Sequence, residues 1–480
     1  MDRINFSSNN RFTVRLELVN KPGVFATVAN LLAKEKADLG AVDIVEVTSK
    51  KIVRDITFDV SKERDTQKVF KDLRKLKNVK VLAVSDRILL LHLGGKIQIQ
   101  NKMPIKTRNQ LSMAYTPGVA KVCRAIAQRP ENVYKLTIKA NSVAVVTDGS
   151  AILGLGNLGP EAALPVMEGK AMIFKEFANI DAWPICLATQ DVEEIVKTVQ
   201  NIAPAFGGIN LEDISAPRCF EIEKRLQELN IPVMHDDQHG TAIVALAALR
   251  NSLKIVKKDI RKIRVVVNGL GAAGAACCRI MLAAGVQNLI GCNTKGAVLV
   301  VNSKNVDKAR KDLFSVKADF SKVTLKEVLR GADVFIGVSA GNILTSKDIK
   351  KMSKDRIVFA MANPDPEINP QEAVKCCRIF ATGRSDFPNQ INNALAFPGI
   401  FRGALNVRAR KINDEMKLAA SAALANLISR QQLNEEYILP SIFDARVVPA
   451  VTKAVEAAAY KTKVAQKKSL ENEDFKKDLY

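Results

Sequence analysis

The sequence predicts an α/β protein in which a small βαββαβ unit precedes two larger α/β domains, the second built on a doubly wound parallel sheet. Three observations lead to this fold class: alternating apolar residues near the amino terminus, buried strands that alternate with helices further along, and a glycine-rich turn after a valine-rich strand. The expected domains are residues 11–86, 89–253 and 254–466, followed by a polar tail over 467–480.

The composition is typical of a globular protein. The 480 residues are 47% hydrophobic and 25% charged, and the chain is long enough for several cores. No apolar run is long enough to span a bilayer and the amino terminus shows no signal peptide, so we expect a cytoplasmic protein without a membrane partner. The eight cysteines lack metal-ligand spacing and are expected to be reduced thiols.

The formal net charge of +22 raises the question of nucleic-acid binding. However, the lysines and arginines are spread along the chain, are not interleaved with stacking aromatic residues, and accompany no RNA-binding signature. We therefore expect no specific nucleic-acid partner, and we interpret the charge as a solvated basic surface that attracts anionic substrates and dinucleotides.

The amino-terminal unit begins with a half-buried strand, because Phe12, Val14, Leu16 and Leu18 alternate with polar residues. A turn over 21–23 follows this strand. The remaining predicted elements are a helix over 24–37, strands over 41–47 and 52–60, a helix over 66–76 and a strand over 79–84. This order is the ferredoxin-like arrangement.

Within this unit, Leu18-Val19-Asn20-Lys21-Pro22-Gly23-Val24-Phe25 and the later strand Val42-Asp43-Ile44 resemble an ACT domain. The resemblance implies that the unit pairs with another copy and binds a small regulatory ligand near Gly23. The alternative is a dimerisation module that binds no ligand.

Two acidic pairs dominate the middle of the chain. The predicted elements there are a buried strand over 143–147, a glycine-rich loop over 154–160, and helices over 161–178 and 241–253. Glu212-Asp213 and Asp236-Asp237 flank one further predicted helix. Four carboxylates this close repel one another unless a cation holds them, and oxygen ligands suit Mg²⁺ or Mn²⁺. We therefore expect Glu212, Asp213 and Asp237 to bind a metal; the alternative is acidic pairs at solvated helix ends.

A GxGxxG turn lies between a strand over 264–267 and a helix over 275–284. The first glycine permits the tight turn, the second lets a pyrophosphate approach, and the third lets the helix pack on the strand. This context predicts Rossmann-type dinucleotide binding at Gly269, Gly271, Ala272, Ala273 and Gly274.

Asn293 stands after the next predicted strand, over 286–292, where such folds usually carry the acidic residue that holds the ribose. Asparagine accepts a hydrogen bond from a hydroxyl but does not repel a 2′-phosphate as aspartate would, and Lys295 is nearby. These residues alone leave the choice between NAD and NADP open. Further strands are predicted over 334–337 and 357–360, and helices over 413–430 and 450–464.

An ordered set of motifs from about Gln98 to about Arg408 resembles the malic enzymes of the small bacterial type. These motifs are Ala114-Tyr115-Thr116-Pro117-Gly118-Val119-Ala120, Thr147-Asp148-Gly149-Ser150, Gly154-Leu155-Gly156-Asn157-Leu158-Gly159-Pro160, Met167-Glu168-Gly169-Lys170-Ala171, the two acidic pairs, Ala362-Asn363-Pro364 and Asn392-Asn393-Ala394-Leu395-Ala396-Phe397-Pro398-Gly399.

The resemblance implies oxidative decarboxylation of L-malate to pyruvate and CO₂ with reduction of NAD(P)⁺, NAD being favoured, in at least a homodimer. It implies that Lys170 is the general base, Tyr115 the general acid and Asp236 the carboxylate that supports them. Tyr115, Lys170, Asn363 and Asn393 are expected to contact the substrate, and Asn363 also the cofactor. The arginine that larger eukaryotic members use for the substrate carboxylate aligns with Ala151, so that role is unassigned here.

A lysine acts as a base only when it is neutral, so we expect burial beside a cation to lower the pKa of Lys170 by several units. Two other functions stay open: a malolactic or oxaloacetate-decarboxylating activity that releases no reduced cofactor, and a non-catalytic, ACT-regulated dinucleotide sensor. Net formation of NADH distinguishes the first of these from malic enzyme activity.

Overall fold

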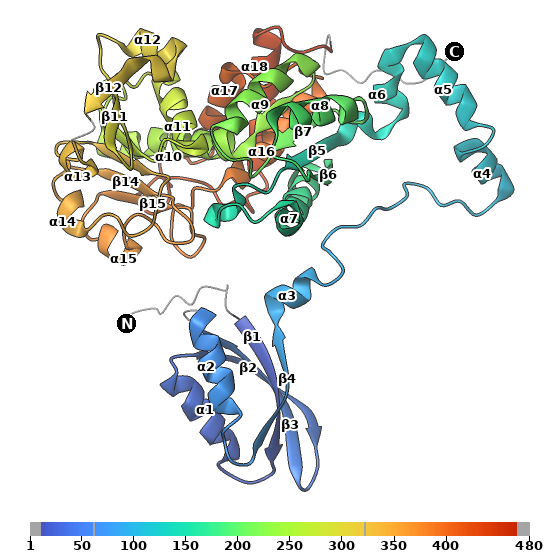
Figure 1. Ribbon diagram of the computed structural model, residues 1–480, viewed down its shortest axis with the longest axis vertical. Coiled ribbons are helices and arrows are strands. Elements are labelled where there is room, and N and C mark those ends of the chain that lie inside the picture. The colour runs from blue at the N-terminus through green and yellow to red at the C-terminus, as the bar shows by residue number, and fades with distance from the viewer. Residues whose placement is uncertain (1–10, 61–62, 321–322, 468–480) are drawn as a thin grey trace. The chain divides into compact units, whose positions relative to one another are not determined.

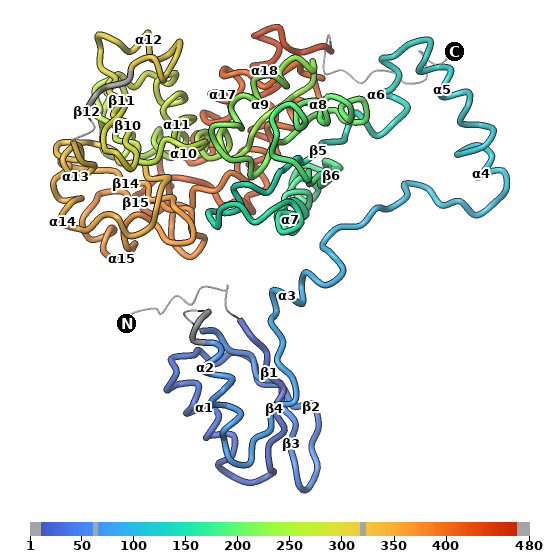
Figure 2. The backbone as a smooth tube through the Cα atoms, viewed as in Figure 1, coloured from blue at the N-terminus to red at the C-terminus, as the bar shows by residue number. Residues whose placement is uncertain are grey.

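The computed structural model describes residues 11–60, 63–320 and 323–467. The chain forms two compact units, Met1–Gln98 and Ile99–Tyr480, which are described in turn (Figures 1 and 2). Of the expected polar tail, only Lys467 falls within the described residues.

The first unit is an antiparallel sheet with the strand order β2-β3-β1-β4 and two helices on one face (Figure 1). Its elements are β1 (Arg11–Val19), α1 (Val24–Lys34), β2 (Asp38–Val47), β3 (Lys51–Asp59), α2 (Glu63–Leu73), β4 (Val79–Asp86) and α3 (Arg87–His92). Strand β1 is half-buried, as its alternating pattern predicts. Its buried face carries Phe12, Val14, Leu16 and Leu18. The predicted βαββαβ order is confirmed.

The first of two sheets in the second unit is four-stranded and parallel, with the order β6-β5-β7-β8. Its strands are β5 (Ser142–Thr147), β6 (Asp181–Cys186), β7 (Gly208–Leu211) and β8 (Val233–His235), and its helices are α7 (Pro160–Ala178), α8 (Val192–Ile202), α9 (Arg218–Leu226) and α10 (Asp236–Val256). Helix α10 begins at Asp236, five residues before the predicted start at Thr241, since carboxylates in a first turn are favoured by the helix dipole.

A seven-stranded sheet follows, with the order β12-β11-β10-β9-β13-β14-β15. Its strands are β9 (Arg264–Asn268), β10 (Asn288–Asn293), β11 (Gly296–Val301), β12 (Lys317–Phe320), β13 (Val334–Gly337), β14 (Ile357–Ala360) and β15 (Ile379–Thr382). Five neighbouring strands are parallel; β9, β10, β13 and β14 were predicted, whereas β15 was not. Strands β11 and β12 are antiparallel and form one edge. Mixed edges of this kind are common in doubly wound sheets, where a short hairpin extends the sheet.

One apolar core joins the two sheets of the second unit. Val143 and Val145 of β5 belong to the same buried cluster as Val265 and Val267 of β9. Helix α10 lies within this cluster and is apolar on nearly all sides, as expected of a buried helix. The other helices are α11 (Ala272–Ala283), α12 (Val306–Lys311), α13 (Leu325–Val328), α14 (Ser346–Ile349), α15 (Pro370–Ala373), α16 (Phe397–Asn406), α17 (Asp414–Asn426) and α18 (Val447–Lys461).

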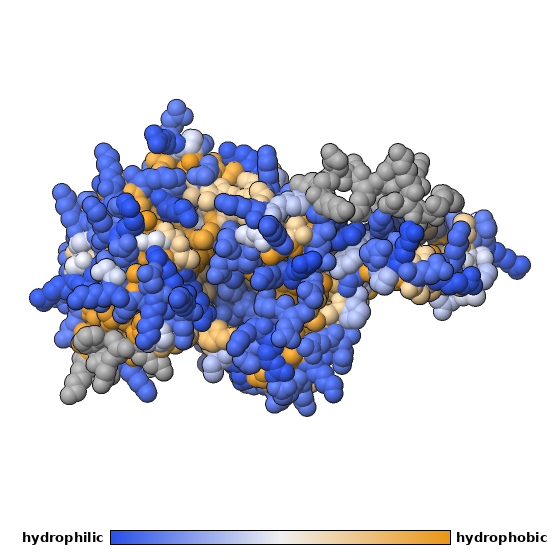
Figure 3. Space-filling model, turned by 90° about the horizontal axis from the view of Figure 1, so that it is seen from above, coloured by the Kyte–Doolittle hydropathy of each residue, from blue (hydrophilic) through white to orange (hydrophobic). Residues whose placement is uncertain are grey.

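Before β5 the second unit has an extended segment, residues 99–137, which we call the arm. It carries α4 (Arg108–Ala114), α5 (Val119–Gln128) and α6 (Val133–Leu136), and α4 and α5 project away from the two sheets of the unit (Figure 1). Within the described part of the chain, no helix has both the length and the apolar composition to cross a membrane. Hydrophilic residues cover most of the face shown in Figure 3, with apolar residues scattered between them.

Candidate active site

The topology brings the two acidic pairs together. Glu212 and Asp213 follow β7 directly, and Asp236 and Asp237 form the first turn of α10, directly after β8. Because β7 and β8 are parallel neighbours, both pairs lie at the carboxyl edge of the sheet. Single carboxylate oxygens of Glu212, Asp213 and Asp237 lie within 4.8 Å of one another. The Asp213 backbone N–H also donates to Asp237 Oδ2 at 2.8 Å.

These three carboxylates, the carboxylate cluster, fit a hard divalent cation. Burial, and then the charge of Asp237, raises the pKa of Asp213 to about 7. Burial also raises the pKa of Glu212 well above its usual value. Asp213 Oδ2 is buried without a hydrogen-bond partner in the protein. A buried carboxylate oxygen that lacks a donor, next to two further carboxylates, suits Mg²⁺ or Mn²⁺.

Lys170 of α7 lies against the carboxylate cluster and is only 6% exposed. Its Nζ is 2.6 Å from Asp236 Oδ2 and 2.9 Å from Glu212 Oε1. Burial lowers the pKa of Lys170, but the charges of Asp236 and Glu212 outweigh burial and raise it. This direction is the opposite of the expected fall, because the lysine lies next to carboxylates.

The orientation of these groups is set by residues without a predicted role. Asn210 Nδ2 donates to Glu212 Oε2 at 2.9 Å, and the Lys170 ammonium lies 4.1 Å from the centre of the Phe397 ring. Asn210 lies two residues before Glu212 on an extended segment, and alternate residues of such a segment point to the same side. The spacing in the sequence therefore already indicated that these two side chains lie on one face. Phe397 belongs to a motif noted in the sequence, but nothing there indicated that its ring faces Lys170.

Asn393, a predicted site residue, donates from Nδ2 to Asp236 Oδ2. Gly240 lies one turn after Asp236 on α10. A Cβ at Gly240 would overlap the Asp236 carboxylate and lie 2.8 Å from Asn393 Cβ. Only glycine therefore leaves room for Asp236 between Lys170 and Asn393.

A further buried carboxylate, Asp148, fixes the loop after β5. It accepts hydrogen bonds from Arg218 Nη2 and the Ser150 backbone N–H, both at 3.0 Å. The Ser150 hydroxyl in turn accepts from the Ser215 backbone N–H at 2.9 Å. These contacts tie the loop after β5 to the loop that carries Asp213. The sequence singled out Asp148 only as part of a motif.

The glycine turn lies where the strand order changes direction, between β10-β9 and β13, which is where doubly wound sheets bind ligands. Gly269 has a φ of +95°, and a Cβ there would overlap the Val338 carbonyl oxygen. A Cβ at Gly274 would overlap the Gly269 carbonyl oxygen, whereas one at Gly271 meets nothing within 4 Å.

Helix α11 begins at Ala272, three residues before the predicted start, because the turn runs directly into the helix. Ala272 and Ala273 therefore lie in its first turn, where backbone N–H groups point out of the helix.

The two predicted amides of the seven-stranded sheet lie at its carboxyl edge. Asn293 is the exposed last residue of β10, and its Oδ1 accepts from the Lys295 backbone N–H at 2.8 Å. Asn363 follows β14, and a Cβ on Gly154 would lie 2.7 Å from its carbonyl oxygen. Asn363 thus meets the glycine-rich loop of the other sheet, so the carboxyl edges of the two sheets approach one another here.

Tyr115 is the predicted site residue that the structure leaves apart from the others. It ends α4 on the arm and is 69% exposed, whereas Lys170 and Glu212 are buried. The arm projects from the sheets (Figure 1).

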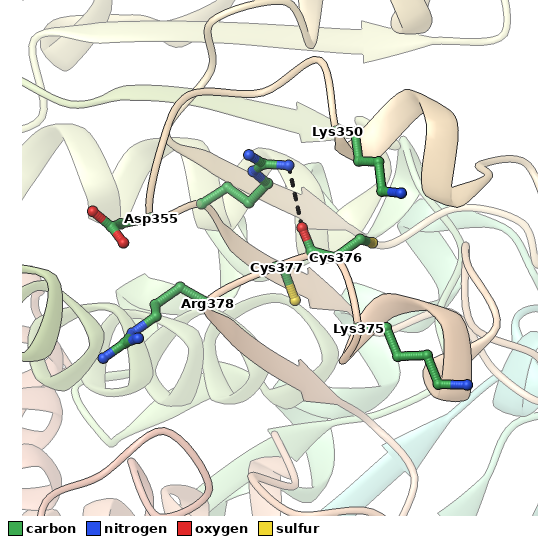
Figure 4. Close-up of a pocket in the computed structure, with 7 residues that line it drawn as sticks. Lys350, Asp355, Lys375, Cys376, Cys377 and Arg378 are labelled. Atoms are coloured by element: carbon green, nitrogen blue, oxygen red, sulfur yellow. Dashed lines mark hydrogen bonds between the residues drawn. The ribbon is translucent and has the colours of Figure 1, made fainter.

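Two surface hollows lie away from these residues. One, of about 450 Å³, is at the amino edges of β14 and β15, where the Arg356 guanidinium donates to the Cys376 carbonyl oxygen at 3.2 Å (Figure 4). The other, of about 470 Å³, lies between α17 and α18. Neither is lined by a predicted site residue.

Comparison with known families assigns most of the chain. Residues 94–227 match the N-terminal domain of malic enzyme, residues 238–461 match the NAD binding domain of malic enzyme, and residues 8–82 match an ACT domain. The expected combination of domain types is confirmed.

Several characterised proteins are similar over most of their length. The NAD-dependent malic enzyme of Geobacillus stearothermophilus is 55% identical over 459 residues, which cover 95% of this chain and 96% of that protein. The bifunctional malic/malolactic enzyme of Bacillus subtilis is 52% identical, covering 78% and 92%. The solved NAD-dependent malic enzyme of Thermotoga maritima is 47% identical with a TM-score of 0.72, covering 78% and 99%. The chain therefore belongs to the malic enzyme family, with an ACT domain before its two malic enzyme domains.

Proposed function

We propose that this protein catalyses the oxidative decarboxylation of L-malate to pyruvate and CO₂ with reduction of NAD⁺. The observation that carries the proposal is a buried lysine, Lys170, held at 2.6 Å from Asp236 and 2.9 Å from Glu212, beside the carboxylate cluster. The dinucleotide-binding sheet presents its carboxyl edge to the same loop region through Asn363. The NAD-dependent relatives at 47% and 55% identity support the same activity.

Glu212, Asp213 and Asp237 would hold Mg²⁺ or Mn²⁺. When bound, the ion would supply polarisation of the substrate oxygens and NAD⁺ would supply the hydride acceptor. The cofactor would be held by the turn Gly269–Gly274, including Ala272 and Ala273, by Asn293 near the ribose and by Asn363.

Lys170 takes the proton from the C2 hydroxyl of malate. Its pKa is raised by Asp236 and Glu212, and burial acts in the opposite direction. A divalent cation held by Glu212, Asp213 and Asp237 would weaken the part of this interaction that comes from Glu212 and Asp237, and its positive charge would act with burial to lower the pKa of Lys170. The same arrangement therefore keeps Lys170 charged without the metal and favours a neutral base when the metal is bound.

Tyr115 donates a proton to C3 of the enolate that remains after CO₂ leaves, and it contacts the substrate together with Lys170. Asn393 orients Asp236, to which it donates a hydrogen bond, and thereby positions Lys170. Asn393 and Asn363 also present amides to the substrate.

We also propose a small regulatory ligand near Gly23 of the ACT domain, a homodimer or higher homo-oligomer, and a cytoplasmic location. The left-handed backbone of Gly23, at a φ of +88°, supports a turn at the start of α1. The eight cysteines, none of which forms a disulfide, support a reducing compartment.

Malolactic activity is the second candidate, because the bifunctional malic/malolactic enzyme of Bacillus subtilis is 52% identical. In that reaction pyruvate is reduced before release, so lactate accumulates and NADH does not.

The test follows the absorbance of NADH and, separately, NADPH when purified protein is given L-malate and Mn²⁺, with and without a chelator. Metal-dependent reduction of NAD⁺ with pyruvate as product supports the proposal. Lactate without net NADH supports the second candidate instead, and the ratio of the NAD⁺ and NADP⁺ rates measures the cofactor preference.

A further inference from the structure

Glu367 is a fully buried residue of the loop after β14, outside every motif noted in the sequence. Its Oε1 accepts from the Ser339 backbone N–H at 2.9 Å and from the Ser339 hydroxyl at 3.3 Å. Its Oε2 accepts from the Ala362 backbone N–H at 3.1 Å. Burial raises the pKa of Glu367, and these hydrogen bonds oppose that effect. In the described part of the chain its partners are thus backbone and hydroxyl donors, and a carboxyl group buried in this way is costly to the fold.

The neighbouring strand leaves space for this side chain. Gly337 is the last residue of β13, and a Cβ there would lie 2.3 Å from Glu367 Cδ. The main chain of Glu367 is held as well, because the Leu344 backbone N–H donates to its carbonyl oxygen at 2.9 Å. The carboxyl group therefore has one defined position, which a larger residue at 337 would disturb.

Ser339 connects Glu367 to the glycine turn. Asn268, the last residue of β9, donates from Nδ2 to Ser339 Oγ at 2.6 Å, and Gly269 follows it directly. A Cβ on Gly269 would lie 2.4 Å from the Val338 carbonyl oxygen and 3.1 Å from Ser339 Cβ. The turn and the loop after β13 are therefore in close contact, and the Ser339 hydroxyl joins both to Glu367.

Ala362 connects Glu367 to the second predicted cofactor residue of this sheet, Asn363, which is the next residue in the chain. Because the Ala362 backbone N–H is bound to Glu367, the start of the Asn363 segment is held by the same carboxyl group as Ser339. One side chain thus links the carboxyl ends of β9, β13 and β14.

These three strand ends lie on one side of the glycine turn. The sheet order is β10-β9-β13-β14, so β10 with Asn293 lies on the other side. A dinucleotide with one ribose at Asn293 and its pyrophosphate at the turn would extend its other half toward β13 and β14. Asn363 also meets the Gly154 loop of the sheet that carries Lys170. The reactive half of the cofactor therefore belongs on the side that Glu367 supports.

We propose that Glu367 is a positioning residue for the nicotinamide half of NAD⁺. It holds the loop after β13 and the Asn363 segment in the arrangement that the cofactor binds. Glu367 is not exposed, so it acts through Ser339 and Asn363 and does not contact the cofactor itself. The inference rests on the proposed function, which places a dinucleotide at this sheet.

The test is the nearly isosteric variant Glu367→Gln. An amide replaces one acceptor oxygen by a donor, so the N–H of Ser339 or of Ala362 then faces another donor. The free protein relieves this conflict by moving one loop, and the cofactor must restore the arrangement. The dissociation constant for NADH, measured by fluorescence titration without malate or metal, should rise by about 10-fold for one unmatched buried donor.

Two further readouts separate positioning from a general loss of structure. The affinity for Mg²⁺ in calorimetry should stay near wild type, because the carboxylate cluster belongs to the other sheet. In steady state, KM for NAD⁺ should rise more than kcat falls, since saturating cofactor restores the arrangement of the loops.

The matched control is Asp333→Asn. Asp333 ties the amino ends of the same strands, because it accepts from the Arg264 backbone N–H at 2.8 Å and from the Ser353 hydroxyl at 2.7 Å. This variant breaks similar contacts at the opposite edge, so its melting temperature should fall while its affinity for NADH stays near wild type.

A second variant, Gly337→Ala, displaces the Glu367 carboxyl group and keeps every polar group of the bridge. It should also weaken NADH binding. If Glu367→Gln does not fold, as circular dichroism would show, Gly337→Ala decides the question in its place.

Wild-type affinity for NADH in a folded Glu367→Gln or Gly337→Ala variant would overturn the proposal. An Asp333→Asn variant that loses as much affinity as Glu367→Gln would overturn it as well, because any loosening of the sheet would then have the same effect. A wild type that does not bind NADH would instead contradict the proposed function, so the two failures are distinguishable.

Discussion

Replacing Gly240 by alanine tests how closely the active site depends on the position of Asp236. The added Cβ would overlap the Asp236 carboxylate and lie 2.8 Å from Asn393 Cβ. Asp236 must therefore move away from Lys170, to which it is hydrogen-bonded at 2.6 Å. A shift of about 1 Å in a catalytic group costs on the order of 100-fold in rate, so kcat/KM for malate should fall by about that factor.

The assay is steady-state NADH formation at saturating metal, with the melting temperature measured in parallel. Alanine favours a helix over glycine by about 1 kcal/mol, which offsets part of the strain, so the melting temperature should change much less than the rate. As a control, Ala247→Gly weakens the same buried helix by a similar amount without contacting Asp236, and its kcat should stay near wild type. A Gly240→Ala variant with wild-type kcat/KM would refute the role given to the position of Asp236.

Three further predictions follow from the site. Asp213→Asn removes one charge from the carboxylate cluster and should weaken Mg²⁺ binding by at least about 10-fold in calorimetry, whereas unchanged affinity would exclude Asp213 as a ligand. Because the pKa of Asp213 is raised to about 7, this residue stabilises the metal-free protein at low pH and loses that contribution as the pH rises through 7. Mg²⁺ should therefore raise the melting temperature more at pH 8 than at pH 6, with proton release at pH 6; equal shifts would contradict this linkage. Asn293→Asp places a negative charge beside the 2′-phosphate of NADP⁺ and should raise the ratio of the NAD⁺ rate to the NADP⁺ rate by about 10-fold or more. An unchanged ratio would show that the ribose does not bind at residue 293.

Local patterns predicted the elements of the fold well. The alternation of Phe12, Val14, Leu16 and Leu18 gave the first strand and its buried face, and the valine-rich strand before Gly269 gave the dinucleotide turn. These signals are periodic or tied to a backbone conformation, so they are present in a single sequence. The antiparallel strands β11 and β12 were missed, because the direction of an edge strand leaves no mark on its own apolar pattern.

The candidate site was predictable where residues stand next to a strand end. Glu212, Asp213 and Asp237 meet because parallel strands align their carboxyl ends, which the order of elements already implies. The contact between Phe397 and Lys170 joins residues more than 200 positions apart and depends on packing across the core. The exposure of Tyr115 was likewise invisible in the sequence, since a motif indicates a role but not how its residues are packed.

The most direct test of the account measures NADH and pyruvate together in one reaction with L-malate, NAD⁺ and Mg²⁺, before and after addition of a chelator and then of excess Mg²⁺. We expect NADH and pyruvate to form in equal amounts, to stop with the chelator and to resume with the metal. Formation of NADH that the chelator does not affect, or conversion of malate without NADH, would contradict a metal-dependent oxidative decarboxylation at the carboxylate cluster.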